Sequence, residues 1–196
     1  MYFILEILGT IAFAISGAMV GIKAKMDILG VVVLGITTAI GGGIIRDILI
    51  GQTPPRAFQH PIYAIIATLV SFVVFIPSIR KRINVDTFIL NLVDAIGLGV
   101  FSVVGVSYGL PYNSLILQIF LGVVTGVGGG VMRDLFAMEK PMIFVRHFYA
   151  VTSIIGVIIA RMIMEYNISM GMIVGVVVIV ILRVLAAYKR WNLPKA

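Results

Sequence analysis

The sequence predicts an all-α integral membrane protein with seven transmembrane helices, arranged as an inverted repeat of two three-helix units plus a seventh helix. Three observations lead to this fold: the composition, the spacing of the apolar segments and a motif that occurs twice. Of 196 residues, 61% are hydrophobic and 12% are charged. A soluble domain has about 45–50% apolar and about 25% charged residues, so the expected solvent is the bilayer.

Seven apolar segments follow one another along the chain, each of roughly the 20 residues that a helix needs to cross a bilayer. The ten-residue alternation of a membrane β-barrel is not present. Short polar or turn-forming stretches separate the segments, at residues 23–27, 51–56, 80–82, 109–113, 139–141 and at Asn167. The predicted spans are residues 2–22, 28–50, 61–79, 87–108, 114–138, 148–166 and 169–187.

The basic residues predict the orientation, because cytoplasmic loops carry an excess of lysine and arginine. With the N-terminus outside, the outer loops hold Arg56 and little else. This predicts a multi-pass protein of the cell membrane with a cytoplasmic C-terminus, and it explains the net charge of +7 without a nucleic-acid partner. The inner side would hold Lys23, Lys25, Arg80, Lys81, Arg82, Lys140, Arg146, Lys189, Arg190 and Lys195.

A Gly-Gly-Gly-x-x-Arg-Asp motif at residues 41–47 reappears 87 positions later, at residues 128–134. Similar offsets match Pro54 with Pro141 and Glu6 with Asp94. Three spans in each copy mean that the second copy enters the membrane from the opposite side. The sequence therefore predicts one membrane domain, 1–196, made of repeat one (1–84), repeat two (87–168) and a seventh helix (169–189).

The two glycine triplets are the main candidate site. Each glycine weakens a helix by about 1 kcal/mol relative to alanine, so three in a row near mid-span predict a break in the second and fifth spans. Main-chain groups freed at that depth need protein or a water-filled cavity around them, and they could replace part of a cation's hydration shell. Close helix packing is the alternative. The residues concerned are Gly41, Gly42, Gly43, Gly128, Gly129 and Gly130.

The charged pairs that follow the triplets are the second candidate. Ionisable groups at membrane depth usually face the interior or a water-filled path, so Arg46, Asp47, Arg133 and Asp134 either line an ion path or lock the two repeats together. Neighbours along a helix do not face each other. We therefore expect each arginine to find its partner in the other repeat.

Several further polar side chains lie on the same predicted spans. The matched acids Glu6 and Asp94 either raise the local cation concentration at an entrance or occupy ordinary interfacial positions. Hydroxyl groups either line the path or bond to their own helix backbone. These hydroxyl residues are Thr37, Thr38, Thr125, Ser16 and Ser102.

The sequence contains no pattern typical of an enzyme. No lysine followed by serine or threonine follows the triplets, as a phosphate loop requires. No nucleophile–base set and no metal-ligand spacing is present, and the chain has no cysteine. We expect no metal, no cofactor and no catalysis.

The doubled motif, the Phe-Ala-Ile-Ser-Gly of residues 13–17 and the turn at residues 25–27 resemble prokaryotic members of the trimeric intracellular cation (TRIC) channel family. Bacterial membrane proteins labelled putative glycine transporters group with this family. The resemblance implies a homotrimer with bound membrane lipids and one path per subunit, bounded by helices 1, 2, 4 and 5 and bent at the triplets. It also implies a channel for monovalent cations, mainly potassium, with sodium as the other candidate ion.

Two departures limit what the resemblance implies. Animal members carry a basic lipid-binding signature in the fifth span, where this chain reads Gly-Val-Met-Arg-Asp at residues 130–134, so lipid gating of that kind is not implied. Inverted repeats and broken helices also occur in transporters. A secondary transporter of a small solute such as glycine therefore stays open as the alternative to a channel.

Overall fold

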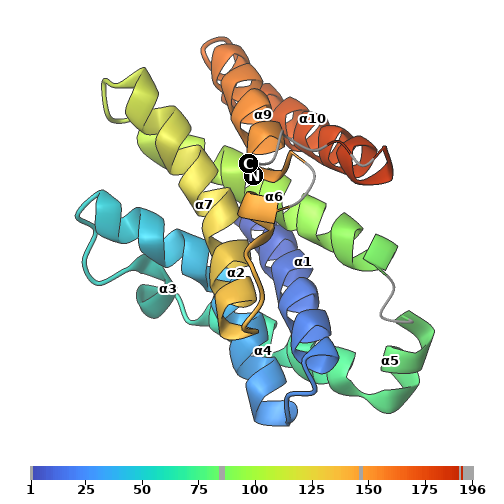
Figure 1. Ribbon diagram of the computed structural model, residues 1–196. Helices are drawn as coiled ribbons and strands as arrows, with labels where there is room; N and C mark the ends of the chain where they lie inside the picture. The colour runs from blue at the N-terminus through green and yellow to red at the C-terminus, as the bar shows by residue number, and fades with distance from the viewer. Residues whose placement is uncertain (1, 84–86, 146–147, 190, 192–196) are drawn as a thin grey trace.

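The computed structural model describes residues 2–83, 87–145, 148–189 and 191, and every regular element within them is helical. This confirms the all-α prediction. Arg146, Arg190 and Lys195, used above for orientation, lie outside the described residues. The helices are α1 (Tyr2–Lys23), α2 (Ile28–Leu49), α3 (Arg56–Gln59), α4 (Ile62–Phe75), α5 (Pro77–Ile83), α6 (Thr87–Gly109), α7 (Leu115–Phe136), α8 (Met142–Val145), α9 (Tyr149–Met164) and α10 (Ile168–Tyr188) (Figure 1).

Five of the described helices, α1, α2, α6, α7 and α10, have the length and hydropathy to cross a membrane. The chain is therefore a multi-pass membrane protein. The other two predicted spans correspond to shorter apolar helices, α4 with 14 residues and α9 with 16. The third segment is divided because α4 ends at Phe75 and α5 begins at Pro77, where proline has no N–H for a continuing helix. Seven complete spans remain a prediction.

Side-chain caps explain where three of the long helices begin. The first turn of a helix has unpaired N–H groups, which a preceding side-chain oxygen can accept. Asp27 accepts from Gly30 N at 2.7 Å before α2, and Ser114 accepts from Leu117 N at 3.3 Å before α7. Asn167 does the same for α10, accepting from Met170 N at 2.9 Å.

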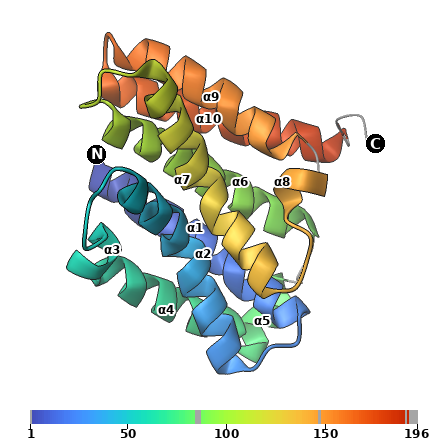
Figure 2. The same cartoon turned by 60° about the vertical axis from the view of Figure 1, so that its left-hand side comes forward.

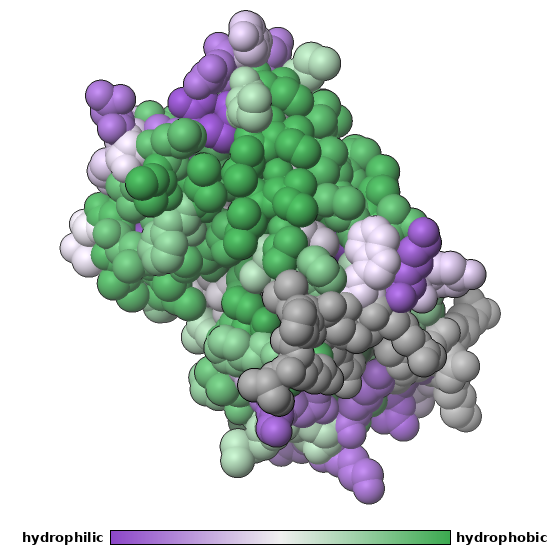
Figure 3. Space-filling view, turned by 45° about the horizontal axis from the view of Figure 1, so that its top comes forward, coloured by the Kyte–Doolittle hydropathy of each residue, from purple (hydrophilic) through white to green (hydrophobic). Residues whose placement is uncertain are grey.

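The helices α1, α2, α6 and α7 form the centre of the molecule, each packed against others of the four (Figure 2). On one flank α4 packs against α1 and α2. On the other flank α9 packs against α7 and α6, and α10 lies against α9 and α6. The space-filling view shows a broad hydrophobic surface with hydrophilic residues gathered toward opposite ends (Figure 3), as a protein that faces lipid tails requires.

Both glycine triplets lie inside uninterrupted helices, so the predicted breaks in α2 and α7 are wrong. The triplets instead bring the two backbones into contact. A Cβ added to Gly42 would overlap the carbonyl of Thr125, and one added to Gly129 would overlap the carbonyl of Thr38. The loss of side chains thus serves the close approach of α2 and α7, which offsets the low helix propensity of glycine.

Matched positions make matched contacts elsewhere in the centre. Gly9 of α1 faces Phe101 of α6, and Gly97 of α6 faces Phe13 of α1. The two phenylalanine rings lie 5.4 Å apart between centroids. Both rings are buried, so an apolar layer fills the middle of the four central helices.

Candidate functional site

Buried charged side chains gather at opposite ends of the four central helices. At one end, the Glu6 pocket lies where α1 begins and α2 ends. Its empty space is about 390 Å³, counted with its open mouth, and it has Gly43 in its wall. The remaining lining residues are Glu6, Thr10, Ala39, Ile40, Arg46, Asp47, Arg56, Ala57, Tyr63 and Phe101.

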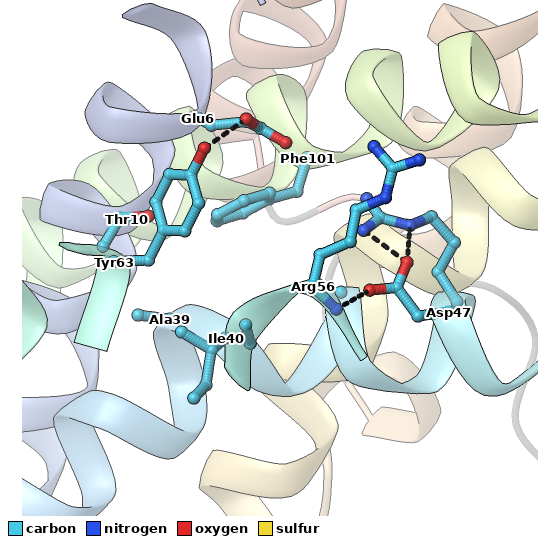
Figure 4. A pocket seen from close by; sticks show the side chains of 11 residues that line it. Glu6, Thr10, Ala39, Ile40, Asp47, Arg56, Tyr63 and Phe101 are labelled. Carbon is cyan, nitrogen blue, oxygen red and sulfur yellow. Dashed lines mark hydrogen bonds and ion pairs between the residues drawn. The ribbon is translucent and has the colours of Figure 1, made fainter. Parts of the chain in front are cut away.

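Two tyrosines hold the Glu6 carboxylate in this pocket. Tyr63 of α4 donates its hydroxyl to Glu6 Oε2 at 2.6 Å, and Tyr108 of α6 donates to Oε1 at 2.9 Å. Figure 4 shows Glu6 and Tyr63 across the pocket from Arg56 and Asp47. Among the described residues Glu6 has no ion-pair partner, so its charge is available to the pocket.

Arg46 pairs with the residue next to it, which corrects the prediction of a partner in the other repeat. Its Nε and Nη2 donate to Asp47 Oδ1 at 2.9 and 2.7 Å. Successive residues on a helix are about 100° apart, and the long arginine side chain curls back across that angle. Its guanidinium also lies 3.9 Å from the ring centroid of Tyr108, and that of Arg56 lies 4.3 Å from the same centroid, a cation–π arrangement.

The aspartate of each Arg-Asp pair also anchors the short helix that follows. Asp47 Oδ2 accepts from Arg56 N, the first residue of α3, at 2.8 Å. Asp134 Oδ2 accepts from Met142 N, the first residue of α8, also at 2.8 Å. The free N–H groups at a helix start bind a carboxylate well. Each aspartate therefore orients an arginine side chain and fixes the first residue of the short helix that follows.

The second group, the Arg133 cluster, lies at the opposite end and consists of Ser16, Asp94, Arg133, Asp134, Tyr149 and Arg183. The Arg133 side chain is fully buried and forms ion pairs with Asp94 Oδ1 and, at 2.8 Å, with Asp134 Oδ1. It also donates to Ser16 Oγ on α1 at 2.5 Å. The contact to the other half of the chain is thus a serine, while both charged partners come from the arginine's own half.

The sequence analysis expected Asp94 either at the entrance of an ion path or at the membrane interface, and neither location is correct. The residue is 0% exposed and paired with Arg133. A buried charge is stable only with a partner and hydrogen bonds, and Arg133 supplies both. The matched acid Glu6 has a different environment, since it lies in an open pocket.

Tyr149 and Arg183 close the space around the Arg133 cluster. A Cβ on Gly130 would lie 2.8 Å from the Tyr149 hydroxyl, whereas a Cβ on Gly43 would have its nearest neighbour 3.6 Å away. The guanidinium of Arg183, from α10, lies 4.8 Å from the centroid of the Tyr149 ring. Both side chains are buried. The end with Gly43 is hollow and the end with Gly130 is filled.

Most of the predicted hydroxyls bond to their own helices. Thr37 donates to Val33 O at 2.8 Å, Thr38 to Leu34 O at 2.6 Å and Thr125 to Leu121 O at 2.5 Å. Ser102 pairs with Ser153 of α9 at 2.8 Å, and Ser16 belongs to the Arg133 cluster. None of the five is among the residues that line the Glu6 pocket.

Two arginines and three tyrosines at the two ends did not emerge from the sequence as site residues: Arg56, Arg183, Tyr63, Tyr108 and Tyr149. Arg183 had a usable signal, because it interrupts the otherwise apolar stretch 168–187 and charges inside spans are costly. Arg56 served only to assign orientation. The tyrosines had no signal, since tyrosine is common wherever a membrane helix nears water.

Known proteins match this chain over nearly its whole length. A family model described as "Glycine transporter" matches residues 3–78 and 91–165. The inner membrane protein YadS of Escherichia coli K12 is 36% identical, covering 96% of this chain and 92% of its own. The membrane protein YvgT of Bacillus subtilis is 39% identical, covering 97% and 94%.

Solved structures agree. One solved structure, which addresses the structural basis for conductance through TRIC cation channels, is 41% identical to this chain. Its TM-score is 0.88, over 98% of this chain and 96% of its own. The TRIC orthologue from Rhodobacter sphaeroides is 29% identical, with a TM-score of 0.85 over 96% and 97%. The relatives are named as channels and membrane proteins, not as enzymes. The chain therefore belongs to the prokaryotic TRIC channel family, to which the glycine transporter family model also corresponds.

Proposed function

We propose that this protein is a channel for monovalent cations, mainly potassium, with a separate path in each subunit of a homotrimer, bounded by α1, α2, α6 and α7. One observation carries the proposal: the Glu6 pocket and the Arg133 cluster lie at opposite ends of the same four helices. Buried ionisable groups in a membrane protein usually mark an ion or substrate pathway. Similarity to cation channels supports the same conclusion.

The path is that of an inverted repeat. A single family model that matches two successive stretches supports this, as do the mirrored contacts of Gly42 and Gly129. With the N-terminus outside, the Glu6 pocket opens to the exterior and the Arg133 cluster faces the cytoplasm. The trimer rests on the relatives, which are described as trimeric channels.

In this conformation the path is closed toward the cytoplasm. Arg133 joins α1, α6 and α7 through Ser16, Asp94 and Asp134, and the phenylalanine rings fill the middle. A cation entering from the pocket therefore needs the Arg133 cluster to loosen before it can leave. Arg133 does not present an unpaired positive charge to this cation, because the carboxylates of Asp94 and Asp134 are paired with it.

Recording from purified protein in planar bilayers tests the proposal. We expect discrete current steps whose reversal potential follows the potassium gradient. Asp94→Asn, which removes one charged partner of Arg133, should raise the fraction of time that the channel is open. Glu165→Gln, in an exposed pair with Arg161 (3.1 Å), is the control and should leave it unchanged. Saturable solute uptake without current steps would contradict the channel.

The alternative is a secondary transporter of a small solute such as glycine. The specific observation in its favour is that the Glu6 pocket presents charges of both signs beside a closed opposite end, as an alternating-access protein requires. Radiolabelled glycine uptake into proteoliposomes, driven by an ion gradient, separates the two functions.

A further inference from the structure

A tyrosine lies close to the matched acid at each end of the central helices. Tyr63 is in the first turn of α4 and Tyr149 is in the first turn of α9. The Tyr63 hydroxyl donates to Glu6 Oε2 at 2.6 Å (Figure 4), and the Tyr149 hydroxyl lies within the electrostatic reach of Asp94. The two ends thus contain the same pair of groups, a phenol and a carboxylate.

The pair at the Arg133 cluster is close together but not hydrogen bonded. Among the described residues, neither the Tyr149 hydroxyl nor Asp94 Oδ2 has a hydrogen-bond partner, although both atoms are buried. Asp94 uses its other oxygen, Oδ1, for Arg133 and, at 3.4 Å, for Ser16. A hydroxyl donor and a carboxylate acceptor are complementary, and a buried polar atom without a partner is costly. The bond that the other end makes is therefore available here, and this conformation does not make it.

The space beside the third glycine of each triplet differs in the same way. In the Glu6 pocket, only the end of the Arg46 side chain lies within 4 Å of a Cβ added to Gly43, at 3.6 Å, so the tyrosine of that end leaves the space open. In the Arg133 cluster, the Tyr149 hydroxyl lies 2.8 Å from a Cβ added to Gly130. An end is thus hollow where its tyrosine binds the acid, and filled where the arginine binds the acid.

We propose that Tyr149 is a positioning residue for opening of the Arg133 cluster. The Asp94 carboxylate leaves Arg133 and accepts a hydrogen bond from the Tyr149 hydroxyl, which moves out of the space beside Gly130. Arg133 keeps its neighbour Asp134, and the cluster takes the arrangement that the Glu6 pocket already has. The two halves of an inverted repeat have related structures, so one end shows a state that is open to the other. The inference rests on the proposed function, which requires this cluster to open.

A buried reporter cysteine measures the opening whether or not the protein conducts ions. The chain has no cysteine. Ser16 is 0% exposed and contacts both Arg133 and Asp94, so Ser16→Cys can react only when the cluster opens. The rate of its modification by a small charged thiol reagent is measured in the purified full-length protein, and every further variant is compared in this background.

Tyr149→Phe removes the hydroxyl and keeps the ring. That hydroxyl makes its hydrogen bond only in the open state, so Tyr149→Phe should slow modification by at least about threefold, a factor that one hydrogen bond supplies. It should not lower the unfolding temperature. Gly130→Ala places a methyl group against the Tyr149 hydroxyl and should speed modification. Tyr166→Phe, on a tyrosine that is 92% exposed, is the matched control and should leave the rate unchanged.

A purely structural role for Tyr149 has a different outcome. If the tyrosine only braced the closed cluster, Tyr149→Phe would leave the rate unchanged or raise it, and either result would overturn the proposal. A Gly130→Ala rate no faster than that of the parent would do the same, as would a Ser16→Cys protein that never reacts. Potassium currents from the same variants test the channel separately. Expected rates without currents would leave the exchange of partners in place and remove the channel, and currents with unchanged rates would do the reverse.

Discussion

At the scale of single residues, the turns that end α2 and α7 have the same backbone geometry, but different residues occupy the left-handed position. Gly51 and Met138 occupy the same place in the two halves, with φ of 72° and 57°. Gln52 N bonds to Asp47 O and Glu139 N bonds to Asp134 O, both after this residue. A left-handed residue in this position is usually glycine, because a Cβ is strained there.

Met138→Gly should therefore stabilise the protein by about 1 kcal/mol, the left-handed strain being partly offset by the greater freedom of glycine in the unfolded chain. Met138 is 94% exposed, so no packing is lost. Gly51→Ala should have the opposite effect. Thermal unfolding in detergent measures both. Equal melting temperatures for wild type and Met138→Gly would show that the turn is unstrained.

The Arg133 cluster shows how much a buried charge depends on its partners. Removing one member of a buried ion pair typically costs about 3–5 kcal/mol, whereas an exposed pair contributes about 0–1 kcal/mol. Asp94→Asn should lower the unfolding temperature by many degrees, and Glu165→Gln by little, because the Glu165 side chain is 60% exposed. Similar losses in the two variants would mean that the Asp94–Arg133 pair is not sealed from water.

At the scale of helices, the contact between α2 and α7 depends on individual glycines of each triplet. Gly42→Ala would place a methyl group against the Thr125 backbone carbonyl, which cannot move as a flexible side chain can. Gly43→Ala meets only the end of the Arg46 side chain at 3.6 Å. These adjacent positions therefore form a matched pair within one helix.

We expect Gly42→Ala to destabilise the protein by roughly 1–3 kcal/mol through overpacking. Gly43→Ala should be neutral or stabilise it by up to about 1 kcal/mol, since alanine favours the helix. Unfolding temperature and elution volume in size-exclusion chromatography report both variants. The proposal of a backbone contact fails if Gly42→Ala is as stable as Gly43→Ala.

The helices themselves could be predicted from the sequence, because apolar length is a property of local residues. The caps at Asp27 and Asn167 coincide with predicted boundaries. The role of the triplets could not be predicted. Glycine both weakens a helix and permits close packing, and only the position of α7 against α2 decides between the two.

The charged partners show the same limit. Arg46 and Asp47 are neighbours in sequence and pair directly, while Arg133 pairs also with Asp94, a partner 39 residues away. The sequence predicted a partner in the other repeat for both arginines. Their surroundings differ because Tyr149 and Arg183 fill the space at the Arg133 end, and Arg183 comes from α10, which follows both copies of the motif.

At the scale of the whole molecule, helix α10 makes the two ends of the central helices different. The four central helices place an Arg-Asp pair at each end, yet only the Glu6 end is hollow. Arg183 of α10 adds a positive charge beside Tyr149, so that the two arginines of this end equal its two aspartates in number. One end is thus an open pocket and the other a closed cluster of buried charges, so in the proposed channel the closed end is the one that must loosen before ions pass.

The orientation and the number of spans are the last properties to test, and the chain suits the test because it has no cysteine. Single cysteines are introduced at exposed positions: Lys25→Cys after α1, Asn113→Cys after α6, Met138→Cys after α7 and Tyr166→Cys after α9. A membrane-impermeant maleimide applied to intact cells should label positions 113 and 166. Positions 25 and 138 should react only after permeabilisation.

This pattern requires that α4 and α9 both cross the membrane, although they have only 14 and 16 residues. At 1.5 Å per residue they reach about 21–24 Å, short of a core of about 30 Å, so flanking residues or local thinning of the bilayer must complete the span. If α4 did not cross, positions 25 and 138 would react from opposite sides. If α9 did not cross, positions 138 and 166 would react from the same side. The fully reversed pattern would keep seven spans and contradict only the orientation.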